Sequence, residues 1–298
     1  MFDCAKVKLG IAPIGWTNDD MPSLGGENTF EQCISEMALA GFTGTEIGNK
    51  YPKDPQVLRS YLEPRGLSVA NAWFSSYLTT KPYEEVERAF IAHRDFLHAM
   101  GAKIIGPCEQ GHSIQGIMDA PVFTQKHIMN DQEWDLLTTG LNKLGAIAKE
   151  KGMYLAYHHH MGTVVQTTQE TDRLMANTDP ELVHLLFDSG HIAYCGEDPL
   201  TLLTRHINRV RHVHLKDIRP EVIARIRNEN LSFNQGVVLG AFTVPGDGSI
   251  DFVPIFEALA KHGYSGWLLV EAEQDPAVAN PFIYACKARD YLCQKAGI

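Results

Sequence analysis

The chain has 298 residues, 44% of them hydrophobic and 21% charged, and its formal net charge is −10. A chain this acidic, with no tract rich in lysine or arginine, lacks the basic footprint that nucleic-acid binding requires. No stretch approaches about 18 apolar residues and the first residues lack an apolar core, so we expect a cytoplasmic protein with no membrane partner. The six cysteines are scattered without a C-x-x-C pair, which excludes zinc-finger and thioredoxin-like sites.

Short apolar runs alternate with amphipathic stretches along the chain. The runs predict eight strands, at residues 9–13, 45–47, 68–73, 104–106, 154–157, 185–187, 210–215 and 266–270. Helices are clearest at residues 29–41, 131–151 and 254–259, where apolar residues recur every three or four positions or a proline stands in the first turn. Eight strands of one type with helices between them predict the α/β class and, within it, a single (β/α)8 TIM barrel.

Two connections are longer than a plain barrel needs, at about residues 108–130 and 218–251. Both follow the carboxyl end of a predicted strand, where insertions build substrate pockets. No low-complexity run or linker divides the chain, so we expect residues 1–298 to form one domain.

The last four predicted strands each end in a group that can bind a metal. His158, Asp188, His214 and Glu271 offer one nitrogen or carboxylate ligand each, and the carboxyl ends of barrel strands meet at one face. Such a mixed set suits Mn²⁺, Co²⁺, Fe²⁺ or Zn²⁺ and leaves positions open for a substrate. A hydrogen-bonded polar residue is the alternative for any one of them, but not for all four together.

Neighbouring polar residues share these strand faces. His158 and His160 point one way and His159 the other, so either of the first two could be the ligand. Lys216 lies two residues beyond the predicted ligand His214 and could serve as an acid, a base or a partner of an enolate oxygen; an ion pair with a nearby glutamate is the alternative. His191 lies in the turn after the sixth strand.

Other candidates are weaker. Glu46 and Glu109 end the second and fourth strands and could hydrogen-bond a polyol, although a solvated surface carboxylate is an equal alternative for each. No G-x-G-x-x-G follows a strand, so a nucleotide cofactor is unsupported, and no G-x-S-x-G predicts a serine nucleophile.

The strand-end motifs resemble those of the xylose-isomerase-like TIM barrel superfamily. The shared marks are Asp188-Ser189-Gly190-His191, residues 212–217 (HVHLKD), and Glu271 after the apolar run 266–270. The resemblance implies that Asp188, His214 and Glu271 bind a divalent metal. Within the superfamily, residues 10–22, 157–163 and 266–276 resemble the inosose dehydratase family. Isomerases and epimerases of the superfamily usually end the fifth strand with a glutamate, whereas His158 takes that place here, and this favours a dehydratase over a two-base epimerase.

The resemblance implies a hydro-lyase of inositol catabolism, which dehydrates the small polyol ketone scyllo-inosose to a trihydroxycyclohexane-1,2-dione. The implied cofactor is Mn²⁺ or Co²⁺, with glutathione implicated by the family alone. Glu271 is assigned as ligand and base, and His160, His191 or Lys216 as the acid. Trp16 is a candidate for packing on the substrate ring, with a core position as its alternative, and Asn18 is a candidate for hydrogen-bonding that ring.

Two rival functions stay open. A ketose or inosose isomerase or epimerase would use the same scaffold, and a polyol-binding barrel without catalysis would keep the pocket alone. The sequence also leaves open whether the chain forms a homo-oligomer.

Overall fold

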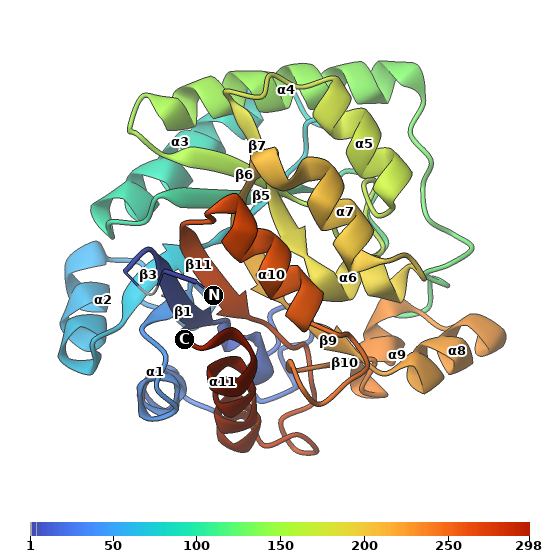
Figure 1. The fold of residues 1–298 in the computed structure, drawn as a ribbon. Helices are drawn as coiled ribbons and strands as arrows, with labels where there is room; N and C mark the ends of the chain where they lie inside the picture. Colours follow the sequence, from blue (N-terminus) through green and yellow to red (C-terminus); the bar gives the residue numbers. More distant parts are fainter. Residues whose placement is uncertain (1, 4) are drawn as a thin grey trace.

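Nine strands form one parallel sheet that closes on itself as a barrel, and Figure 1 shows them in the middle of the molecule with helices around them. The computed structural model describes residues 2–3 and 5–298. In order around the barrel the strands are β1 (Val7–Ile11), β2 (Gly44–Glu46), β3 (Ser68–Asn71), β4 (Trp73–Ser76), β5 (Ile104–Glu109), β6 (Tyr154–His158), β7 (Val183–Asp188), β8 (Val210–Leu215) and β11 (Gly266–Val270).

The third barrel position is shared by two short strands. β3 pairs with β2 and β4 pairs with β5, while only Ala72 separates β3 from β4. The sequence predicted one strand at 68–73; the chain instead breaks at Ala72 and continues extended to Ser76. The short strand β2 ends its pairing at Asn71, after which the chain pairs on its other side with β5. Counted by position, the barrel has the eight strands expected, and the predicted TIM-barrel fold is confirmed.

Helices cover the outside of the barrel, and local signals start them. Thr29 caps the first helix by accepting from the Gln32 N–H, and Asn130 forms a capping box with Glu133 at the start of the long helix. The helices are α1 (Phe30–Leu39), α2 (Pro55–Leu62), α3 (Tyr83–Ala99), α4 (Asp131–Lys149), α5 (Thr168–Ala176), α6 (Ser189–Tyr194), α7 (Pro199–His206), α8 (Pro220–Glu229), α9 (Phe233–Val238), α10 (Val253–His262) and α11 (Pro281–Ala296).

The two long connections pack against each other beyond the strand ends. The connection after β8 contains α8, α9 and a two-stranded sheet of β9 (Asp217–Ile218) and β10 (Phe242–Thr243), which Figure 1 shows grouped at one end of the molecule. The Val122 N–H, in the connection after β5, donates to the Leu231 carbonyl. A separate apolar cluster that includes Val122, Tyr194 and Phe233 is buried between them. Burial of this cluster gives the connections a fixed place beside the strand ends.

Two further features bear on the expectations from composition. Cys4 lies outside the described residues, and the five described cysteines are free thiols. Within the described part of the chain, no helix combines the length and apolar character needed to span a bilayer.

His184 makes the free energy of unfolding depend on pH. It is buried in β7 with its ring against Tyr154, and burial, together with Arg211 and Arg209 nearby, lowers its pKa from 6.5 to about 4. The unfolded chain therefore takes up the proton at a higher pH than the folded chain does. As the pH falls from 6.5 through 4, this proton uptake favours the unfolded chain and lowers the free energy of unfolding. We expect a loss of about 2 kcal/mol over that range.

Urea unfolding at a series of pH values measures this effect as the difference between the chain and a His184→Gln variant. The exposed His262, at the end of α10, gives the matched control His262→Gln. Equal pH dependence in all three proteins would contradict the prediction.

Candidate metal centre and active site

A cavity of about 530 Å³ opens at the carboxyl ends of the strands. It lies where a TIM barrel places its active site. Its polar wall is built by residues from most of the barrel strands and from the loops beyond them, namely Asp20, Glu46, Asn71, Gln115, His158, His160, His214, Glu271 and Glu273.

Three of the four residues predicted as metal ligands, His158, His214 and Glu271, line this cavity, and the buried Asp188 lies directly beside two of them. His158 ends β6, Asp188 ends β7, and Glu271 follows β11 directly. The Asp188 Oδ2 atom lies 3.5 Å from His158 Nε2 and 3.4 Å from His214 Nδ1. The Glu271 Oε2 atom lies 2.8 Å from the same Nδ1. These separations match neighbouring ligand atoms around one ion with bonds of about 2.0–2.2 Å.

The donor set itself fits a divalent cation. His158 Nε2, Asp188 Oδ2 and His214 Nδ1 are buried, and although they lie close to one another and to Glu271, none of them makes a hydrogen bond of regular geometry. Buried polar atoms are rarely left unpaired, and three of them facing one another indicate a missing partner. The carboxylates of Asp188, Glu271 and Glu273 outnumber the single buried ammonium beside them, that of Lys216. A divalent cation would satisfy both the free lone pairs and the excess negative charge.

The pKa shifts agree with this role. Burial lowers the pKa of His158 to about 4, so its imidazole is neutral and free to coordinate. Burial raises the pKa of Asp188, but His191, Lys216 and the hydrogen-bonding histidines outweigh it and hold the pKa well below its usual range. Burial lowers the pKa of His214, yet Glu271 and Glu46 raise it well above its usual value. A proton and a metal therefore compete for His214 Nδ1.

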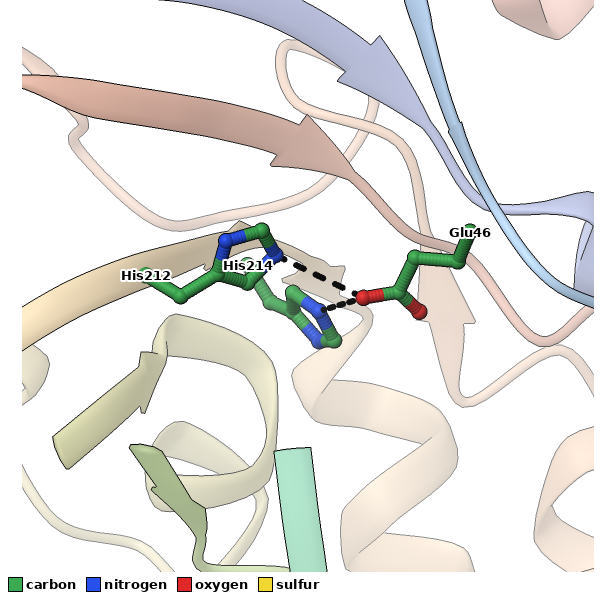
Figure 2. A group of neighbouring side chains, drawn as sticks. All are labelled: Glu46, His212 and His214. Atoms are coloured by element: carbon green, nitrogen blue, oxygen red, sulfur yellow. Dashed lines mark hydrogen bonds and ion pairs between the residues drawn. The ribbon is translucent and has the colours of Figure 1, made fainter. Parts of the chain in front are cut away.

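Glu46 orients His214 rather than facing the cavity alone. Its Oε1 lies 2.8 Å from His214 Nε2 and 3.4 Å from His212 Nε2, and Figure 2 shows both rings directed at that one oxygen. The Asn71 amide also donates to Oε1, at 2.9 Å. A carboxylate on one nitrogen of a histidine turns the other toward a metal and fixes its tautomer. Glu46, which was predicted to bind a polyol, therefore lies behind His214, a predicted metal ligand.

Lys216 is held by three acceptors. Its Nζ lies 2.5 Å from Glu271 Oε1, 2.9 Å from His191 Nε2 and 3.3 Å from Glu273 Oε1. An ammonium has three N–H groups, so each has an acceptor. Burial lowers the pKa of Lys216, but Glu271, Glu273 and Asp188 outweigh it and raise the pKa above its usual value. Burial and the neighbouring cations lower the pKa of His191 well below its usual value. Lys216 is therefore a cation that fixes two glutamates.

The four-residue motif at the end of β7 is explained by these contacts. The Asp188 Oδ1 atom caps α6 by accepting from the His191 N–H, which leaves Oδ2 for the metal position. The Ser189 hydroxyl donates to the Lys216 carbonyl at 2.8 Å. A Cβ on Gly190 would lie 2.4 Å from Lys216 Cγ, so the stem of Lys216 needs a glycine there.

We expect Gly190→Ala to destabilise the protein by about 1–3 kcal/mol and to displace the Lys216 ammonium, because a buried methyl group would overlap the lysine stem. Chemical unfolding measures the loss. Gly116→Ala is the matched control, since a Cβ there meets no atom within 4 Å. Equal stability of the two variants would show that Lys216 moves aside freely.

His160 belongs to a second group, formed with His191 and Glu273. Its Nε2 lies 3.6 Å from Glu273 Oε1, and its ring lies against that of His191 with centroids 3.6 Å apart. The His160 Nδ1 atom lies 2.8 Å from the Met161 carbonyl. A carbonyl only accepts, so Nδ1 carries the hydrogen and a neutral His160 presents a free Nε2 lone pair.

The structure does not bring three of the predicted substrate-binding residues to the cavity wall. Trp16 is buried in the core, and its indole N–H donates to Glu36 at 2.6 Å. The Asn18 Oδ1 atom accepts the N–H groups of Asp20 and Met21 and so holds a turn. Glu109 accepts from Ser76, Thr79 and the backbone around them, which places it as a buried anchor of the loop after β4.

Several residues that line the cavity were not among the predicted metal, catalytic or substrate-binding residues, although Glu273 was considered as an ion-pair partner of Lys216, which it is. Asp20 and Gln115 are neighbours on its wall, with the Gln115 amide donating to the Asp20 carboxylate at 2.7 Å. Glu273, two residues beyond Glu271, has a buried Oε2 with no partner. Strand alternation places Glu273 on the same face as Glu271, and this pattern could have identified Glu273 as a cavity residue. No comparable sequence pattern marks loop residues such as Gln115.

The fold and this site define a xylose isomerase-like TIM barrel. The sequence model of that family matches residues 34–289, and the chain belongs to the family. More particularly, it belongs with the inosose dehydratases, as its resemblance to them predicted. It is 65% identical over 298 residues to the inosose dehydratase of Clostridium botulinum (strain Alaska E43 / Type E3) and 66% identical to that of Clostridium perfringens (strain ATCC 13124); each alignment covers 100% of both chains.

The likeness to solved structures concerns the fold. The IOLI protein, solved with a bound zinc atom, has a TM-score of 0.72 and 15% sequence identity, with 97% of this chain and 98% of that chain covered. At that identity the match shows a shared barrel.

Proposed function

We propose that the protein is a hydro-lyase that removes water from scyllo-inosose, a cyclic polyhydroxy ketone, and gives a trihydroxycyclohexane-1,2-dione. The observation that carries this proposal is the set of buried, unpaired ligand atoms on His158, Asp188 and His214 beneath a polar cavity. Full-length relatives at 65% and 66% identity that are named inosose dehydratase support the substrate.

We assign His158, Asp188, His214 and Glu271 as the residues that would hold the divalent metal. When bound, such a cation acts as a Lewis acid that polarises a ketone and makes the neighbouring C–H acidic. Of these four, Glu271 was also assigned as the base from its sequence position. In the structure one oxygen of Glu271 faces His214 and the other lies on Lys216, and these neighbours outweigh burial to lower its pKa to about 2. The low pKa of Glu271 favours its role as a metal ligand over its role as the base.

His160 is the better-placed proton carrier. Its free Nε2 faces the cavity and lies beside Glu273, which would stabilise the imidazolium. In the proposed reaction Nε2 takes the proton from the carbon next to the ketone. The C–O bond of the following carbon breaks as its hydroxyl takes up that proton from the His160 imidazolium and leaves as water, which returns His160 to its neutral form. The remaining enol becomes the second ketone. Lys216 and His191 position Glu271 and Glu273 and do not line the cavity.

The test is to incubate the Mn²⁺- or Co²⁺-loaded protein with scyllo-inosose and to follow product mass and ultraviolet absorbance. Loss of one water with growth of a dione absorbance is expected. A product of unchanged mass would replace the proposal with an epimerase, and no turnover with bound metal would leave a polyol-binding barrel.

Several finer assignments belong to the same proposal. We infer Mn²⁺ or Co²⁺ as the working metal because imidazole and carboxylate ligands with open positions suit both. The polar wall of Asp20, Asn71, Gln115 and Glu273 would receive the hydroxyl groups of the substrate. We assign no residue to glutathione. The continuous barrel supports one domain over residues 1–298, and a cytoplasmic location remains an expectation.

A further inference from the structure

A second cluster of metal-binding side chains lies outside the cavity, at the two ends of the connection between β5 and α4. The Glu133 Oε1 atom lies 3.3 Å from His112 Nε2 and 3.0 Å from His127 Nε2. The three ligand atoms lie within 4.8 Å of one another. Two imidazoles and one carboxylate form a set that binds zinc with a fourth position open to water. We propose that His112, His127 and Glu133 form a divalent-cation site for Zn²⁺ or a similar transition metal.

The backbone around each ligand is already fixed. Glu133 is the third residue of the capping box of α4, and its Oε2 accepts the Asn130 N–H at 2.8 Å. Its other oxygen, Oε1, is thereby left for the histidines. Lys126 holds the chain at His127, because its ammonium donates to the His127 carbonyl and to Glu170 in α5.

His112 is brought to the site by an unusual backbone. Its φ is 62°, and among the described residues only Asn230 shares a left-handed conformation without being glycine. This turn stacks the His112 ring on that of His127, with centroids 4.3 Å apart and planes at 24°. Both Nε2 atoms therefore face the same carboxylate oxygen. The two side chains are 39% and 35% exposed, so the rings are free to turn toward a shared cation.

A cation here would tie residue 112 to residues 127 and 133 and so close the whole connection into a loop. Gln115, which lines the active-site cavity and donates to Asp20, lies inside that loop. Zn²⁺ at this site would restrain one wall of the cavity. This consequence rests on the proposed function, whereas the site itself does not.

The test is the Zn²⁺ content of the full chain after equilibrium dialysis, measured by elemental analysis. An Asp188→Asn background removes a predicted ligand of the first centre, so the remaining Zn²⁺ reports on the second. In that background we expect His127→Ala and Glu133→Gln each to lose the bound Zn²⁺. Glu133→Gln is the sharper variant, because glutamine still completes a capping box and α4 keeps its start.

His98→Ala, at an exposed histidine near the end of α3, is the matched control and should bind as its parent does. Thermal unfolding without metal checks that each variant folds. The proposal is overturned if the Asp188→Asn chain binds no Zn²⁺, or if His127→Ala and Glu133→Gln bind as much as His98→Ala. Both results are independent of whether inosose is turned over.

Discussion

An Asp188→Asn variant is expected to lose the metal of the active site, and with it the dehydration of inosose, while its fold stays intact. Asp188 Oδ2 lies within 3.5 Å of the His158 and His214 imidazoles and 3.9 Å from His191 Nε2, so the amide would remove the negative charge at the centre of the ligand set. Loss of residues that only support ligands weakens metal binding about 10–100-fold, and loss of a ligand should exceed about 100-fold. Titration of the metal-free protein with Mn²⁺ measures the affinity, and product formation measures the activity.

The design separates the two functions of Asp188. Its Oδ1 also caps α6, and asparagine caps a helix as well as aspartate does. Asp198→Asn is the matched control, since Asp198 caps α7 through the N–H groups of Leu200 and Thr201 and is not among the residues that line the cavity. If Asp188→Asn bound Mn²⁺ as tightly as Asp198→Asn, Asp188 would not be a ligand.

The barrel and the centre of its site could be predicted because both follow from backbone regularity. Parallel strands in a closed barrel bring their carboxyl ends to one face, so the last residues of β6 and β7 must meet. Alternation within a strand then places His212 and His214 on one side. These rules need no knowledge of the loops, and they located His158, Asp188, His214 and Glu271 correctly relative to one another.

Residues on loops obey no such rule. Trp16 follows β1 on a loop, and Glu109 is the last residue of β5, yet the partners of each come from other segments: the indole is bound by Glu36 of α1, and the carboxylate by Ser76 and Thr79. Gln115 reaches the cavity because its segment is bonded to the loop after β6, where the Ile114 N–H donates to the Gly162 carbonyl, and because its amide donates to Asp20. Such contacts depend on side-chain packing between segments far apart in the chain, which periodicity does not encode.

The same limit explains the position of Lys216. Strand alternation placed it near the metal ligands but could not show that its three N–H groups are already taken by Glu271, His191 and Glu273. Lys216 therefore neutralises and positions Glu271 and Glu273, so its removal tests the stability of the protein as well as its activity.

We expect Lys216→Met to lower the free energy of unfolding of the metal-free protein by about 3–5 kcal/mol, because the change breaks a buried ion-pair network and keeps its acidic half. Methionine has a similar length and fills the space over Gly190 and Phe242. The three carboxylates that raise the pKa of Lys216, those of Glu271, Glu273 and Asp188, then remain buried without their cation. Urea unfolding after chelation measures the loss. Saturating Mn²⁺ should recover part of it, since binding to the folded state alone stabilises that state.

Lys126→Met is the control for removing a largely buried lysine from a carboxylate. Lys126 is 8% exposed and pairs with one acid, Glu170, at 2.5 Å. The other oxygen of Glu170 accepts the N–H groups of Gln166 and Thr167, so this carboxylate keeps hydrogen bonds when the lysine is gone. A smaller loss of about 1–2 kcal/mol is expected for Lys126→Met, because the Glu170 carboxylate keeps two backbone hydrogen bonds. A comparable loss for Lys216→Met would mean that the carboxylates around it are neutralised by protons, and that Lys216 is no more than an ordinary ion-pair partner.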